Sequence, residues 1–280
     1  MKIYYSLYTN GNRFNDTTLN MWKLSLALVK KHYGENNSIE LVCDTYAKEI
    51  LKDLPFDNIH VLLDRINYPT IWSLGKIYAY DFACSIKEPF LHLDADVFLW
   101  EPLPENLLAS PVFCQSKDIV IGSAFYHADK LKLYTRTTTP KDWHDYKGTM
   151  TYNMGVFGGT DTYLIKDYCD YVLNMINNSI YKPLWAIDKL TAVPENFDFS
   201  GTKSCLVEQG NLGIFCKNKN ITPALIFDDL SDSNIHTYKK YTHLMSRKND
   251  QDVIKKINQR VATKPYDLLP KDVTIEEWNT

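Results

Sequence analysis

The chain has 280 residues, of which 45% are hydrophobic and 13% aromatic, so it is long and apolar enough to bury a core as one large domain. A net charge of −3 and the absence of long basic runs argue against nucleic acid as a partner. The six cysteines show no CxxC spacing, which favours free buried thiols over zinc ligands or disulfides.

The N-terminal stretch "MKIYYSLYTNGNRFNDTT" turns polar too soon for a signal peptide. No apolar run approaches the roughly 18 residues that a transmembrane helix needs. We therefore expect a cytoplasmic protein, either free or loosely associated with the inner face of the membrane.

The first half of the chain alternates strands and helices. Strand patterns at "KIYYSLYT", "SIELVCD" and "NIHVLLD" are separated by a helix that carries Leu19 to Val29 and by the short helix "TYAKEILKDLP". A further helix over Ile71 to Ser85 leads into the apolar strand "FLHLDADVF". This order predicts an α/β fold of Rossmann-like type, with a mainly parallel central sheet flanked by helices.

The second half offers strand candidates at "DIVIGSAFY" and "YNMGVFGG" and a helix over Asp161 to Asn178. The segments "NLGIFCKN" and "ALIFDDL" each read as a strand or a short helix. Near the C-terminus, Val253, Ile257 and Val261 keep helical spacing. We expect a single catalytic domain over residues 1–250 and a docked helical tail over residues 251–280.

Two aspartates, Asp94 and Asp96, interrupt the apolar strand "FLHLDADVF" near its carboxyl end. Residues two apart in a strand point to the same face, so we expect the two carboxylates to lie close together. Their repulsion calls for a cation, and paired carboxylates suit Mg²⁺ or Mn²⁺. Ligands of open α/β sheets bind at this end of the strands. The alternative is that either aspartate caps the following turn or pairs with a lysine.

The segment "LGKIYAYDFACSIKEPFLHLDADVFLWEPLPE" resembles the central part of GT-A-fold glycosyltransferases with a DxD motif, and its layout is most similar to glycosyltransferase family 8. The resemblance implies that Lys76, on the helix before the aspartates, contacts a nucleotide-sugar donor. It also implies that Asn153 and Gly155 of "YNMGVFGG" line the donor sugar.

Two later motifs extend the resemblance. Glu208 and Gln209 of "VEQGNLG" match an acidic-Gln pair near the reacting carbon, and the family usually has Asp where Glu208 stands. In "YTHLMSRKND", His243 matches a histidine that joins Asp94 and Asp96 around the metal. A following basic residue that touches the diphosphate is matched by one of two neighbours, Arg247 or Lys248. Thr9, just beyond the first strand, is expected near the base.

The resemblance implies a metal-dependent transfer of a sugar from a nucleoside-diphosphate donor, with UDP favoured, to a glycan hydroxyl, in the synthesis of a surface polysaccharide. Retention of the anomeric configuration is favoured, and Glu208 suits either stereochemical outcome.

Two other readings stay open. One is a haloacid-dehalogenase-type phosphatase with Asp94 as nucleophile, Ser123 as its serine and Asp228 and Asp229 as its metal pair. The other is a glycosyltransferase-like domain that only binds its ligand.

Overall fold

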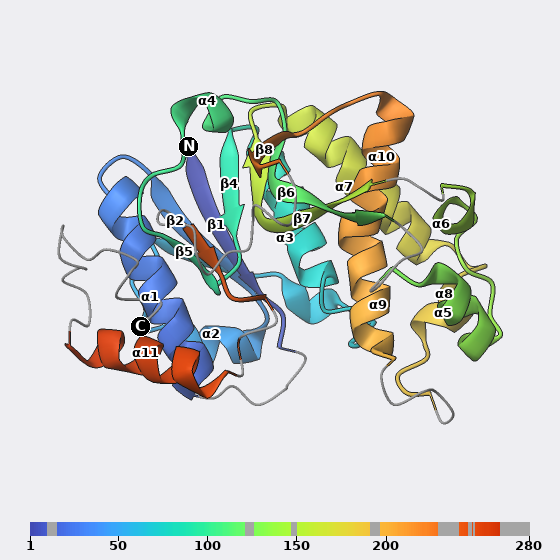
Figure 1. The fold of residues 1–280 in the computed structure, drawn as a ribbon, viewed down its shortest axis with the longest axis horizontal. Helices are drawn as coiled ribbons and strands as arrows, with labels where there is room; N and C mark the ends of the chain where they lie inside the picture. The colour runs from blue at the N-terminus through green and yellow to red at the C-terminus, as the bar shows by residue number, and fades with distance from the viewer. Residues whose placement is uncertain are drawn as a thin grey trace.

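The computed structural model describes residues 1–9, 16–120, 126–146, 150–190, 197–228, 241–245, 248 and 250–263. Its centre is a seven-stranded sheet in the order β3-β2-β1-β4-β7-β6-β8 (Figure 1). Four neighbouring pairs are parallel, and β7 runs antiparallel to both of its neighbours. The predicted α/β fold with a mainly parallel, Rossmann-like sheet flanked by helices is confirmed, and it forms one domain.

The first half of the chain follows the predicted alternation of strands and helices. The elements are β1 (Lys2–Leu7), α1 (Asp16–Tyr33), β2 (Ser38–Cys43), α2 (Thr45–Leu51), β3 (Asn58–Val61), a 3₁₀ turn (Leu63–Arg65), α3 (Leu74–Ser85) and β4 (Phe90–Leu93). Asp44 ends β2 and begins α2, because its carboxylate accepts a hydrogen bond from Ala47 N at 2.7 Å.

Each strand sends alternate side chains to opposite layers. Ile3 and Tyr5 of β1 pack in the cluster formed with α1 and α2, whereas Tyr4 packs in the cluster formed with α3 and α7. The sheet is therefore covered by helices on both faces, as a buried parallel sheet requires.

The second half contains α4 (Glu105–Leu108), β6 (Phe113–Val120), α5 (Ala128–Thr135), α6 (Asp142–Asp145), β7 (Met150–Gly159), α7 (Thr162–Asn177), α8 (Lys182–Trp185), α9 (Phe199–Cys205), a π-helical turn (Leu206–Gly210), α10 (Asn211–Lys219) and β8 (Ala224–Phe227). The strand expected at "DIVIGSAFY" begins earlier, at Phe113, because it pairs with both β7 and β8 from there. The segment "NLGIFCKN" is helical, and "ALIFDDL" supplies the edge strand β8.

The expectation of one continuous strand through the two aspartates is wrong. β4 ends at Leu93, a turn holds Asp94 to Asp96, and a second strand, β5 (Val97–Leu99), follows. Val97 N donates to Asp94 O at 3.0 Å and closes the turn. β5 leaves the large sheet and pairs antiparallel with β9 (Tyr241–His243), so the two carboxylates converge through a turn and not through a shared strand face.

The helix α11 (Gln251–Thr263) lies against α1, as Figure 1 shows for the red and blue helices. Val253 and Ile257 are buried there in a small cluster with Met21, Leu24 and Leu28 of α1. The expected tail beyond residue 263 lies outside the described residues. All six cysteines are free, and five of them are buried. No helix in the described part of the chain has the length and apolar content needed to cross a bilayer.

Candidate metal centre and cleft

Asp94, Asp96 and His243 converge at the carboxyl end of β4. One ligand atom from each of the three lies within 4.8 Å of the others. The backbone fixes this arrangement, because Asp94 N donates to Gly155 O at 2.9 Å and Leu244 N donates to Asp96 O at 3.0 Å. The register of β5 and β9 sets His243 opposite Val97, directly after Asp96. Residues about 150 positions apart in the chain thus form one cluster.

His243 is held by Gln115, a buried residue of β6 that the sequence motifs did not reveal. The ring Nδ1 lies 2.7 Å from Gln115 Oε1, and Tyr241 OH donates to the same oxygen at 2.6 Å. Since an amide oxygen only accepts, His243 carries its proton on Nδ1 and turns the Nε2 lone pair towards Asp96, 3.6 Å from Oδ2. Burial lowers the pKa of His243, which keeps the ring neutral.

Gly155 makes room for this pair of side chains. A Cβ atom at position 155 would lie 2.5 Å from His243 Cε1 and 2.8 Å from Gln115 Oε1, closer than real Cβ contacts allow. The glycine of "YNMGVFGG" therefore supports the histidine, and Asn153 in turn accepts a hydrogen bond from Gly155 N at 3.0 Å. Neither Asn153 nor Gly155 lines the large cleft described below.

Two lysines offset the charges of the carboxylates. Lys76 Nζ lies 2.7 Å from Asp94 Oδ2 and 3.1 Å from Glu208 Oε1, and Lys248 Nζ lies 2.9 Å from Asp96 Oδ2. Burial raises the pKa of Asp96, but the ammonium group of Lys248 outweighs it and holds the pKa below its usual value. Burial likewise opposes the charge of Lys76, yet Asp94 and Glu208 raise its pKa. Both Asp96 and Lys76 are therefore charged at neutral pH.

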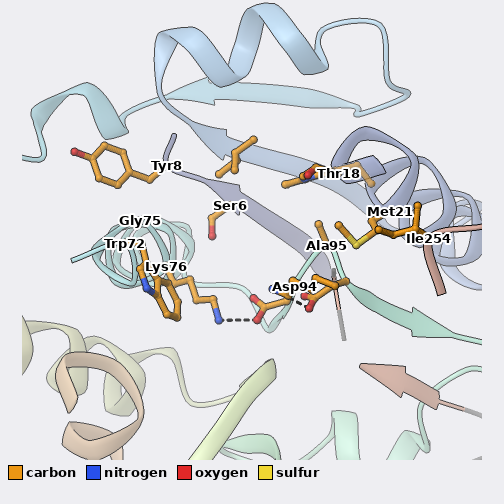
Figure 2. A pocket seen from close by; sticks show the side chains of 14 residues that line it. Ser6, Tyr8, Thr18, Met21, Trp72, Gly75, Lys76, Asp94, Ala95 and Ile254 are labelled. Atoms are coloured by element: carbon orange, nitrogen blue, oxygen red, sulfur yellow. Dashed lines mark hydrogen bonds and ion pairs between the residues drawn. The ribbon is translucent and has the colours of Figure 1, made fainter. Parts of the chain in front are cut away.

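The cluster opens onto a cleft of about 410 Å³ (Figure 2). Its charged side holds Lys76, Asp94, Asp96 and Lys248. The remaining wall comes from Ser6 and Tyr8 of the β1 end, from Met21 and Trp22 of α1, from Trp72 before α3, and from Ile254 of α11. Trp72 is 43% exposed at the rim, and Lys76 Nζ lies 5.9 Å from its ring centre. The cleft thus offers a charged floor and an apolar and aromatic wall to a ligand.

Glu208 and Gln209 lie in the π-helical turn, a distortion that often marks functional sites. Glu208 is fully buried and does not line the cleft; its Oε1 accepts hydrogen bonds from Lys76 and from Tyr80 OH. Burial raises its pKa to about 7, against the opposing charge of Lys76. Gln209 is partly exposed, and its side-chain oxygen accepts a hydrogen bond from Tyr126 OH.

Thr9 makes its hydrogen bonds within the fold and not to the cleft. Its backbone N and its hydroxyl both donate to Asp44 Oδ2, at 2.6 Å and 2.7 Å, while the other oxygen of Asp44 caps α2. The neighbouring Tyr8, and not Thr9, lines the cleft. Arg247 lies outside the described residues.

The donor set fits a divalent cation. Two carboxylates and one neutral imidazole combine hard oxygen ligands with a nitrogen that Mn²⁺ accepts more readily than Mg²⁺ or Ca²⁺, which favour oxygen alone. The hydrogen bond that orients His243 is the kind of outer contact that metal-binding histidines make. Asp94, Asp96 and His243 would hold the ion.

Of the residues expected for a phosphatase besides Asp94, the structure describes Asp228, which does not join the cluster. Asp228 follows β8, at the sheet edge, with β6 and β7 between it and β4. Ser123 and Asp229 lie outside the described residues.

Comparison with known proteins gives a family without a known activity. None of the curated proteins matches the chain. The model of one family, described as a family of unknown function (DUF6734), matches residues 8–270. Because the match spans most of the 280 residues, the chain belongs to the family of unknown function DUF6734.

Proposed function

We propose that the protein is a metal-dependent glycosyltransferase that moves a sugar from a nucleoside-diphosphate donor, with UDP favoured, to a glycan hydroxyl. The observation that carries the proposal is the cluster of Asp94, Asp96 and buried His243, whose two aspartates line a cleft together with Lys76 and Lys248. The resemblance of the same residues to GT-A-fold glycosyltransferases, family 8 in particular, points the same way. Surface polysaccharide as the acceptor rests on that resemblance alone.

The charges of the site suit a diphosphate. Lys76 and Lys248 together carry two positive charges, which Asp94 and Asp96 cancel. A bound divalent ion would supply a Lewis acid for the departing diphosphate and bring the sum of these charges to about +2, which Glu208, with a pKa of about 7, lowers by a fraction of a charge. Lys248, whose side chain is half exposed and lines the cleft beside Asp96, would add a positive charge next to a bound phosphate.

The role of Glu208 follows from its burial. A carboxyl with no exposed atom does not reach an acceptor hydroxyl in the cleft, which disfavours Glu208 as the general base of an inverting enzyme. Glu208 instead accepts a hydrogen bond from Lys76 Nζ, which also donates to Asp94. We assign Glu208 as the positioning residue of Lys76, and Gln209, the partly exposed member of the pair, as the one nearer the reacting sugar.

The test is a donor screen. The protein is incubated with UDP-, GDP- and ADP-sugars, in Mn²⁺ or in EDTA, and the released nucleoside diphosphate is quantified. Release from one donor class that needs Mn²⁺ and disappears in Asp96→Asn supports the proposal. Phosphate release from p-nitrophenyl phosphate, with no turnover of any donor, contradicts it and favours a phosphatase. Metal-dependent nucleotide binding without turnover favours a binding domain.

A further inference from the structure

A serine at the cleft is hydrogen-bonded to a buried histidine that the proposed function does not use. Ser6, near the end of β1, lines the cleft, and its hydroxyl lies 2.9 Å from Nε2 of His92 in the neighbouring strand β4. His92 is 1% exposed, sits opposite Tyr4 in the strand register and meets the ring of Tyr80 edge-on at 4.9 Å. The imidazole is therefore fixed by the sheet on one side and by α3 on the other.

The direction of this hydrogen bond follows from the other ring nitrogen. His92 Nδ1 is buried and has no hydrogen-bond partner among the described residues. A neutral imidazole carries one N–H and one lone pair. If the proton were on Nδ1, an N–H donor would be buried without an acceptor, which is costlier than an unmatched lone pair. The proton therefore belongs on Nε2, which donates to Ser6 Oγ.

This arrangement leaves the hydroxyl hydrogen of Ser6 without an acceptor in the described part of the protein. Figure 2 shows the hydroxyl of Ser6 turned towards the side of the cleft where Lys76 and Asp94 lie. The same arrangement excludes Ser6 and His92 as a nucleophile and base, because Nε2 already holds its proton and cannot take one from the serine.

We infer that Ser6 is a ligand-binding residue of the cleft, that its hydroxyl donates a hydrogen bond to a ring hydroxyl of the bound nucleotide sugar, and that His92 is its positioning residue. The inference rests on the proposed function. A donor hydroxyl and the carboxylate of Asp94 line the same cleft, and such a donor and acceptor match a sugar hydroxyl because that group both accepts and donates. A phosphate oxygen only accepts, so it could pair with Ser6 but has no hydrogen to donate to Asp94.

Two sources can supply such a hydroxyl, the ribose and the transferred sugar, and calorimetric titration in Mn²⁺ separates them. Ser6→Ala should bind the UDP-sugar, which carries both hydroxyl sources, about fivefold more weakly than the wild type does, and Ser6→Thr, which keeps the hydroxyl, should bind it within about twofold. Ser85→Ala, an exposed serine at the end of α3, is the matched control. If the ribose is the source, the deficit of Ser6→Ala disappears with 2′-deoxy-UDP or 3′-deoxy-UDP. If the transferred sugar is the source, the deficit appears only with the UDP-sugar.

The role of His92 in positioning Ser6 is tested with two substitutions of His92. His92→Phe keeps a ring and removes the donor, and His92→Gln restores an N–H near the same place. We expect His92→Phe to weaken binding as much as Ser6→Ala, with no further loss in the double variant, and His92→Gln to recover most of the affinity. A variant that melts earlier but binds normally would show a structural role only and overturn this assignment.

Nucleotide binding by the wild-type protein and the role of Ser6 in that binding are tested by different results. Wild-type protein that binds no nucleotide in Mn²⁺ overturns the proposed function, and the inference with it. Wild-type protein that binds UDP, together with Ser6→Ala that binds UDP and UDP-sugars equally well, overturns the inference about Ser6 and leaves the proposed function standing.

Discussion

Replacing Gln115 with methionine should weaken metal binding although none of the three proposed metal ligands is replaced. Methionine has a similar length but offers no amide oxygen, so Tyr241 OH and His243 Nδ1–H both lose their acceptor in the core. Each buried donor left unsatisfied costs about 1–3 kcal/mol, so the free energy of unfolding should fall by about 2–6 kcal/mol. Loss of the contact that orients a metal-binding histidine typically costs about 10–100-fold in metal affinity.

The assay is a Mn²⁺ titration followed by electron paramagnetic resonance of the free ion, with urea unfolding in EDTA measured in parallel. Gln115→Glu keeps an acceptor for Nδ1–H and should bind Mn²⁺ at least as well as the wild type. Tyr241→Phe removes the other donor to the same oxygen, so it should change Mn²⁺ affinity by less than about threefold. A folded Gln115→Met protein with unchanged Mn²⁺ affinity would refute the assignment of His243 to the metal.

Three further predictions concern the ligands, the buried acid and the C-terminal helix. Asp96→Asn should abolish detectable Mn²⁺ binding in the same resonance titration; retained binding would show that the carboxylate is not a ligand. For Glu208, whose pKa rises from 4.5 to about 7 on folding, the native state keeps a proton that the unfolded chain loses, so stability falls as pH rises between these values. As the pH rises from 4.5 to 7 in EDTA, the free energy of unfolding of Glu208→Gln should therefore increase by on the order of 3 kcal/mol relative to that of the wild type. Urea midpoints of the two proteins that change in parallel with pH would argue against the raised pKa of Glu208. Ile257→Ala, at the buried face of α11, should lower the free energy of unfolding in urea by about 2–5 kcal/mol. Lys255→Ala, on the exposed face, should leave it almost unchanged. Equal effects of the two substitutions would mean that α11 does not dock on α1.

The first half of the fold could be predicted because its signals are local. The alternating strand and helix periodicity and the apolar run before Asp94 each lie within a few residues of sequence. The carboxylates of Asp94 and Asp96 lie close together, as predicted, but they meet through a turn that the apolar pattern of "FLHLDADVFLW" hides, and not on one strand face.

The rest of the site depends on contacts between distant segments. His243 was expected only through a family resemblance, and its position follows from the pairing of β5 with β9, which no local pattern encodes. Gln115 carried no signal at all, because a buried glutamine within a strand looks the same whether it orients a ligand or fills the core. Its one trace in the sequence is Gly155, whose missing Cβ atom leaves room for both side chains.

The most direct test of the metal-dependent nucleotide site is the melting temperature of the wild-type protein with UDP or GDP, in Mn²⁺ and in EDTA. A ligand at 100 times its dissociation constant stabilises the native state by about 2.7 kcal/mol, which corresponds to a shift of several degrees for a chain of this size. We predict a rise with one nucleoside diphosphate that occurs in Mn²⁺, vanishes in EDTA and is absent in Asp96→Asn. No rise with any nucleotide in Mn²⁺, or an equal rise in EDTA, would contradict the account.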